Sequence, residues 1–237
     1  MTLDVVYEPP FRAAVNARIA ATLAGLGFLC LGLWAFFTEE TSPALTMAHI
    51  GLAAGVAMLP GRGPSLGVWN GVKDHVSAAA TVLLWILLLR FFVMFPRPKR
   101  IGESRLIAGV IYGAWGCFLV FLVAELIVHP VLYYTTGSVA GLLMLVYGLL
   151  IFVAIAHTVL QSTRVELRES GMNLILGGFL VAIGGIVAAF IPGLNLPGWT
   201  SALSILAIPL TMALAVRRQA RLEEMRVNKR GPSPELT

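Results

Sequence analysis

Residues 87–100 read LLLRFFVMFPRPKR, an apolar run that ends in three cations with no acidic residue among them. A long apolar run is typical of a helix that crosses a membrane, and Lys and Arg collect at the cytoplasmic end of such helices. We therefore interpret Arg97, Lys99 and Arg100 as a basic anchor on the cytoplasmic side. Arg90 lies close enough to the end of the run for its long side chain to reach the same interface.

The composition of the whole chain agrees with this interpretation. Of the 237 residues, 58% are hydrophobic and only 12% are charged, and the mean hydropathy is +0.85. A soluble domain typically carries about 25% charged residues, so we predict an integral membrane protein whose first partner is the lipid bilayer. The net charge of +5 could suggest a nucleic-acid partner. However, the cations lie at the edges of apolar runs and form no continuous stripe, so we expect none.

The lengths of the apolar runs predict an all-α bundle. A helix needs about 20 apolar residues to cross the hydrocarbon core. Five runs reach this length, and they cover residues 17–37, 77–95, 106–129, 138–160 and 171–191. A sixth run, 199–216, is shorter and contains Pro209, which a membrane helix tolerates as a kink. The stretch 45–60 is shorter still, so we expect a polytopic bundle of six to seven transmembrane helices.

The distribution of Lys and Arg distinguishes two topologies. If 45–60 does not cross, both termini are cytoplasmic, and only Arg62 and Lys73 among the loop cations lie outside. If it crosses, the N-terminus moves outside together with Arg12 and Arg18. We prefer six full spans with 45–60 partly inserted, and we keep seven spans as the alternative. In both versions the C-terminus is cytoplasmic.

This topology divides the chain into three parts: an N-terminal tail at 1–16, the transmembrane bundle at 17–216 and a basic cytoplasmic tail at 217–237. The tail begins with Arg217, Arg218 and Arg221. We expect these cations to anchor it to anionic lipid, at roughly 1 kcal/mol for each. The alternative is a helix that binds a partner protein.

Small residues recur at helical spacing in three places: Gly171 with Gly178 and Gly185, Gly109 with Gly113, and Gly137 with Gly141. Small residues allow helix backbones to approach closely where lipid provides no hydrophobic drive for association. We expect these faces to pack within the chain, and homodimerisation is the alternative.

One candidate binding site stands at the outer end of the 106–129 run. Glu125 and His129 lie four residues apart on one helical face, so they can share a proton or form an ion pair. Tyr133 and Tyr134 follow, and Trp199 comes from the other outer loop. These residues are our candidate ligand-binding set. The alternative is a structural pair beside an aromatic interface belt.

Other chemistry is scarce in this sequence. His49 and His157 invite a haem or metal interpretation, but their runs place them towards opposite sides of the membrane. Cys30 and Cys117 lie inside apolar runs and provide no metal-ligand spacing. We find no nucleophile motif, phosphate-binding loop or catalytic carboxylate pair, so we expect neither an enzyme nor a bound cofactor or metal.

The stretch LLLRFFVMFPRPKR resembles the aromatic-rich helix with a Phe-Pro stop in the multi-span N-terminal sensor regions of bacterial histidine kinases. That group includes the competence quorum-sensing kinase. Three later stretches are similar to the same family: TRVELRESGMNLILGG, IPGLNLP and LAIPLTMALAVRRQARLEE. Order and spacing match from about residue 45 to 222. The resemblance implies a signalling role in the bacterial cytoplasmic (inner) membrane.

The sequence departs from this family after the last helix. Such kinases continue into a dimerisation helix with a phospho-accepting histidine and then an ATP-binding domain. Here no histidine follows His157, and no nucleotide motif is present. We therefore expect a sensor-like region without kinase activity.

Two functions from different classes follow. In the first, the chain is a stand-alone sensory or regulatory module that couples an outer-face ligand or membrane state to a cytoplasmic partner. In the second, it is a non-catalytic accessory subunit packed against a larger membrane complex, for example an energy-transducing one. A transporter comes third, because no inverted repeat or central group of charged residues is evident.

Overall fold

The computed structural model describes residues 10–39, 41–58, 68–96, 105–128, 134–190, 200 and 204–230. Across these residues all regular structure is helical. The helices are α1 (Pro10–Thr38), α2 (Ser42–Ala57), α3 (Val68–Met94), α5 (Arg105–Val128), α6 (Tyr134–Gln161), α7 (Arg164–Glu169), α8 (Met172–Phe190) and α10 (Ala207–Arg230). The prediction of an all-α protein is confirmed.

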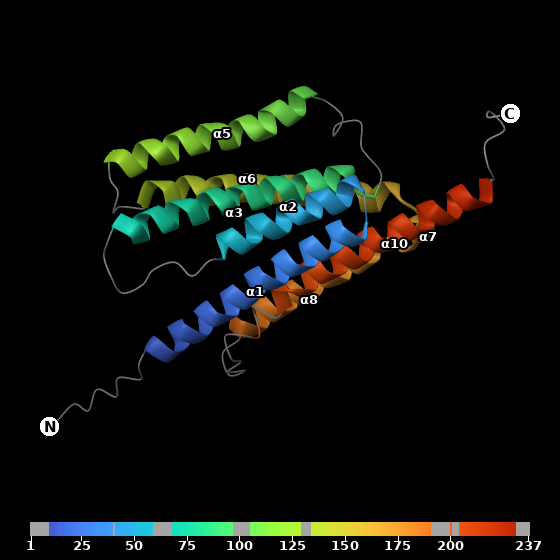
Figure 1. Ribbon diagram of the computed structural model, residues 1–237, viewed down its shortest axis with the longest axis horizontal. Helices are drawn as coiled ribbons and strands as arrows, with labels where there is room; N and C mark the ends of the chain where they lie inside the picture. The colour runs from blue at the N-terminus through green and yellow to red at the C-terminus, as the bar shows by residue number, and fades with distance from the viewer. Residues whose placement is uncertain are drawn as a thin grey trace.

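The long helices run back and forth through one bundle (Figure 1). The most extensive contacts between helices are those of α1 with α2, of α2 with α3 and of α3 with α6, and α10 lies against α8 and α1. α5 packs against α3 and α6. We call the end of the bundle where α3 and α6 begin the His75 end, and the opposite end the Phe95 end.

In the described part of the chain, four helices are long and apolar enough to cross a membrane: Ile19–Thr38, Gly71–Met94, Gly109–Val128 and Thr136–Gln161. These helices indicate a membrane protein. α2 and α8 are also apolar but shorter. The uncertain stretch 45–60 forms most of α2, a regular helix that returns alongside α1 (Figure 1). Thr41 caps its first turn by accepting a hydrogen bond from the backbone N–H of Ala44.

The glycines spaced by seven residues pack α8 on α10. A Cβ at Gly178 would meet Thr211 and the carbonyl oxygen of Ala207, and one at Gly185 would meet Ser204. Gly171 precedes α8 with φ +76, a left-handed conformation that favours glycine, and it lies against Ala215. For this set, the predicted packing within the chain is confirmed.

A second close contact joins α1 to α2, and the sequence analysis did not single it out. A Cβ at Gly32 would lie 2.7 Å from the carbonyl oxygen of Met47, and one at Gly51 would lie 2.5 Å from that of Phe28. The two backbones therefore touch. The hairpin is tight because both helices present glycine at the same level.

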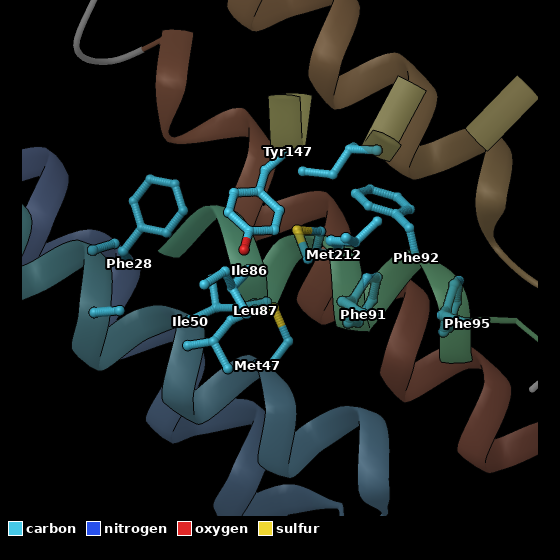
Figure 2. Packing of buried hydrophobic residues seen from close by; sticks show 14 of the residues in the cluster. Phe28, Met47, Ile50, Ile86, Leu87, Phe91, Phe92, Phe95, Tyr147 and Met212 are labelled. Atoms are coloured by element: carbon cyan, nitrogen blue, oxygen red, sulfur yellow. The ribbon is translucent and has the colours of Figure 1, made fainter. Parts of the chain in front are cut away.

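The aromatic stretch quoted above forms the centre of the core (Figure 2). Phe91, Phe92 and Phe95 are almost completely buried, and the rings of Phe91 and Phe95 stack with centroids 5.0 Å apart. Around them lie buried residues from α2, α8 and α10: Met47, Ile50, Met172, Ile175, Met212 and Val216. This run thus packs α3 against α2, α8 and α10 at the Phe95 end.

The outward faces of α5, α6 and α8 are strongly apolar. Large side chains such as Ile127, Leu145 and Leu180 are about 70% exposed, at 75%, 69% and 71%. In a membrane such faces contact lipid.

Gly109 and Gly113 lie on α5, and a Cβ added at either position would have no described atom within 4 Å, so this glycine pair does not pack within the described chain. The reason is that α5 stands at the rim of the bundle.

Two further boundaries differ from the sequence interpretation. The basic loop before α8 contains the short helix α7, which begins with a capping box between Thr163 and Glu166. α10 continues as a helix through residue 217 to Arg230, so the start of the predicted tail extends the last helix.

Candidate functional site

Glu125 lies in the last turn of α5 and faces the interior of the bundle. Its side chain is 9% exposed, and its Oε2 lies 3.9 Å from Nε2 of His75 on α3. The sequence analysis paired Glu125 with His129, which lies outside the described residues. That pairing stays a prediction, and among the described residues the partner of Glu125 is His75, which the spacing argument did not include.

His75 is held from its other side by its own helix. The side chain is 1% exposed, and Nδ1 lies 2.6 Å from the carbonyl oxygen of Gly71, one turn earlier in α3. A carbonyl oxygen accepts and cannot donate, so Nδ1–H is the donor of this hydrogen bond. The bond orients the ring so that Nε2 points to Glu125. The distance between Nε2 and Oε2 exceeds the range of a direct hydrogen bond, so the contact is an ion pair only when His75 is protonated.

The helix directions bring these residues together. α3 and α5 are antiparallel, and the hydrogen bond from Trp115 Nε1 to the carbonyl oxygen of Ala79 (3.3 Å) pins them near the middle. Tyr147 on α6 donates to the carbonyl oxygen of Ile111 on α5 at 3.0 Å. In this antiparallel register the start of α6 lies level with the end of α5.

Thr136, in the first turn of α6, adds a third polar group at the His75 end. Its side chain is fully buried, and Oγ1 has no hydrogen-bond partner among the described residues. The register of α5 against α6 puts Thr136 about one turn from the level of Glu125. Oε2 of Glu125 is likewise buried without a hydrogen bond in the described part of the chain. Buried polar atoms of this kind are uncommon, and an ionisable group such as Glu125 inside an apolar bundle is a functional-site hypothesis.

The rest of the candidate ligand-binding set is not placed by the structure. His129, Tyr133 and Trp199 lie outside the described residues, and Tyr134 begins α6 with a side chain that is not described. The predicted outer pocket therefore stays a prediction. An apolar groove does run between α1 and α2, lined by Leu26, Leu29, Leu52, Val56 and Met58 among others, but it contains none of the predicted ligand-binding residues.

The basic residues divide into three groups. Arg97, Lys99 and Arg100 lie outside the described residues. Arg218 and Arg221 are exposed on α10. Arg217 instead packs over the ring of Trp34 on α1, with its guanidinium carbon 5.4 Å from the ring centroid, so it ties α10 to α1 by a cation–π contact.

The Phe95 end has polar links of its own. Arg90 is exposed on α3 and donates to the hydroxyl of Tyr112 on α5 at 2.9 Å. Gln219 on α10 donates through Nε2 to the carbonyl oxygen of Pro96, just beyond α3, at 2.8 Å. α3 therefore has polar contacts with α5 towards both of its ends and with α10 at the Phe95 end.

No metal site is evident at either end of the part of the bundle that the structure describes. His49 and His157 are both exposed. Within the described ranges, no three His, Cys, Asp or Glu side chains lie close enough together to hold a metal ion.

His75 was missed because the sequence interpretation began the second long span at residue 77. The structure begins α3 at Val68. A signal was present, since Val82 and Leu89 follow His75 at successive intervals of seven residues and both are buried. Extending this apolar stripe backwards by two turns places His75 on the inner face of the helix.

No family model, curated protein or solved structure matches this chain.

Proposed function

We propose that this chain is a membrane sensory or regulatory module that couples the state of its outer face to a cytoplasmic partner. The observation that carries the proposal is the buried His75–Glu125 ion pair between α3 and α5. An ionisable pair inside an apolar bundle is costly and is a functional-site hypothesis by default. Here it stands at one end of a helix whose other end contacts the C-terminal helix.

α3 provides the physical route between the two ends. His75 lies near its start, and the Pro96 carbonyl that accepts from Gln219 follows its end. The rise of a helix separates these positions by about 30 Å, which is the thickness of the hydrocarbon core. A change at the ion pair that shifts or tilts α3 therefore changes how α10 packs against the end of α3 at the opposite face.

The proposal includes a topology of seven passes. α2 returns alongside α1, so the chain traverses the bundle between α1 and α3 (Figure 1). Counting α1, α2, α3, α5, α6, α8 and α10, this arrangement favours seven passes over the six that we preferred from charge alone. The short α2 is accommodated by local thinning of the bilayer. Most Lys and Arg then lie at the Phe95 end, which we assign to the cytoplasm.

A photo-crosslinking amino acid at position 221 tests the coupling in the native membrane, because Arg221 is exposed on α10. We expect it to capture a cytoplasmic protein with a yield that changes when Glu125→Gln alters the outer pair. Lys73→Gln is the matched control, because it removes an exposed charge two residues from His75. Equal yields in wild type, Glu125→Gln and Lys73→Gln would contradict the proposal.

The unpacked glycines of α5 favour a second candidate function, the accessory subunit. Gly109, Gly113 and Gly116 have no described atom within 4 Å of an added Cβ, and only 17% of the apolar part of α5 is buried. Small residues on an outer face suit close contact with a helix of another membrane protein.

Purification in mild detergent with mass spectrometry separates the two functions. A stoichiometric complex that Gly113→Leu abolishes supports the subunit, whereas a chain that purifies alone supports the sensor.

A further inference from the structure

The hydrogen bond to Gly71 determines which nitrogen of His75 faces Glu125. Because Nδ1 donates to the Gly71 carbonyl oxygen, a neutral His75 has only a lone pair on Nε2. That lone pair faces Oε2 of Glu125 at 3.9 Å. An ionised carboxylate also presents only lone pairs, and two acceptors that face each other repel. A proton on either atom replaces this repulsion with attraction.

We infer that His75 and Glu125 together hold one proton, either on Nε2 or on the Glu125 carboxyl group, and that a second proton, taken from the outer solution, is the stimulus of the sensory module. The inference rests on the proposed function and names the stimulus at the same site. Both one-proton forms, imidazolium with carboxylate and imidazole with carboxylic acid, have a net charge of zero. Neutrality matches a site whose side chains are 1% and 9% exposed.

A second proton removes the attraction that holds the pair. It converts the site to an imidazolium facing a carboxylic acid, with a net charge of +1. An uncompensated charge in an apolar interior is strongly unfavourable, and admitting water relieves it. We therefore expect α5 to separate from α3 at the His75 end when the second proton binds.

The other titratable side chains that the structure describes on the surrounding helices lie further away. α2, α5 and α6 pack around this part of α3, and α5 and α6 pack on each other. The titratable side chains that the structure describes on α2, α5 and α6, apart from Glu125, are His49, Tyr112, Cys117, Tyr147 and His157. Each lies at least about two helical turns deeper in the bundle than the pair.

The helix that carries His75 contributes two nearby charges. Lys73 is exposed and Asp74 is partly exposed, two residues and one residue before it. Neither occupies the interior position between α3 and α5. On α6, the neighbouring polar groups Thr136 and Ser138 do not titrate.

α5 is able to move because few contacts hold it. Only 17% of its apolar part is buried, against 44% for α3. Its polar links to the bundle include the ion pair at one end and, further along, Trp115, Tyr112 and the Ile111 carbonyl. Loss of the ion pair alone therefore frees the His75 end while the Phe95 end remains attached.

Nitrogen NMR of histidine in nanodiscs tests which nitrogen of His75 carries hydrogen in the wild-type protein. The chain has four histidines, and His75→Gln assigns the signal. We expect Nδ1 to carry hydrogen when His75 is neutral. A neutral His75 with hydrogen on Nε2 and none on Nδ1 would overturn the inference.

Spin-label distances test the movement. With Cys30 and Cys117 replaced by Ala, labels at the exposed positions 76 and 127 report the His75 end, and labels at 110 and 160 report the Phe95 end. Between about pH 8 and pH 5, where histidine changes charge, we expect the first distance to lengthen by about 2 Å or more and the second to stay constant. A first distance that is independent of pH would overturn the inference.

Two variants complete the test. His75→Gln with Glu125→Gln leaves two neutral amides, so we expect no response to pH, whereas Lys73→Gln should respond as the wild type does. A response that persists in the double variant refutes the shared proton.

If the His75 end opens with acid but the crosslinking yield at position 221 does not change, the proton inference stands and the proposed function fails. If the yield depends on Glu125 but the helices do not open, the opposite holds.

Discussion

Substitution of Gly51 by alanine tests the backbone contact between α1 and α2. The new Cβ would lie 2.5 Å from the Phe28 carbonyl oxygen and 3.3 Å from the Cα atoms of Gly32 and Leu29. Carbon rarely approaches oxygen within 3.0 Å, so the hairpin must open by about 0.5 Å or more. Forcing a packed interface apart in this way costs about 1–3 kcal/mol. The alanine offsets up to about 1 kcal/mol of this loss through its higher helix propensity.

Gly113→Ala is the matched control. Gly113 also lies inside a long apolar helix, but no described atom lies within 4 Å of its added Cβ. The propensity gain is therefore similar in the two variants, and only Gly51→Ala carries the steric cost. We expect Gly51→Ala to be less stable than Gly113→Ala by about 2 kcal/mol, which is more than a tenfold difference in the unfolding equilibrium.

The assay is reversible unfolding in mixed micelles, followed by the fluorescence of the five tryptophans, with the proportion of denaturing detergent increased stepwise. The free energy of unfolding is compared among wild type, Gly51→Ala and Gly113→Ala. Equal stability of the two variants would refute the argument, because it would show that α1 and α2 do not touch through their backbones.

The other predictions concern the core, the basic face of α10 and the topology. Phe91→Ala should cost about 3–5 kcal/mol in the same assay because Phe91 is 1% exposed, whereas Phe152→Ala on the lipid face should cost much less; similar losses would contradict the core assignment. Arg218→Gln with Arg221→Gln should weaken retention of anionic lipid in native mass spectrometry by roughly 1 kcal/mol for each cation removed, and unchanged retention would argue against an anchor. A C-terminal tag should be accessible only from the cytoplasm, and labelling of that tag in intact cells would reverse the proposed topology.

The positions of the long helices were predictable from the sequence because their cause is local. A run of about 20 apolar residues must satisfy its own backbone hydrogen bonds in lipid, and a helix does so within the run. The runs 17–37, 106–129 and 138–160 accordingly correspond to the apolar parts of α1, α5 and α6 within a few residues. The start of α3 was missed by nine residues, because Lys73, Asp74 and His75 give that segment a polar composition.

Packing faces were predictable only in part. The spacing of Gly171, Gly178 and Gly185 indicated a contact face, and the structure places α10 against it. The same kind of spacing at Gly109 and Gly113 lies on the outer face of α5. Spacing shows that a helix can be approached closely, but the position of that helix in the bundle decides whether a partner is there.

The sequence by itself determined that this chain is helical, apolar enough for a membrane and basic at the edges of its apolar runs, because each of these properties depends on neighbouring residues. Only the tertiary structure decided that Glu125 faces His75, that Gln219 bonds to Pro96 and that α1 touches α2 through Gly32 and Gly51. Each of these contacts joins different helices, and its existence depends on the register and rotation of both. Those quantities are set by packing summed over the whole bundle, and no local pattern contains them.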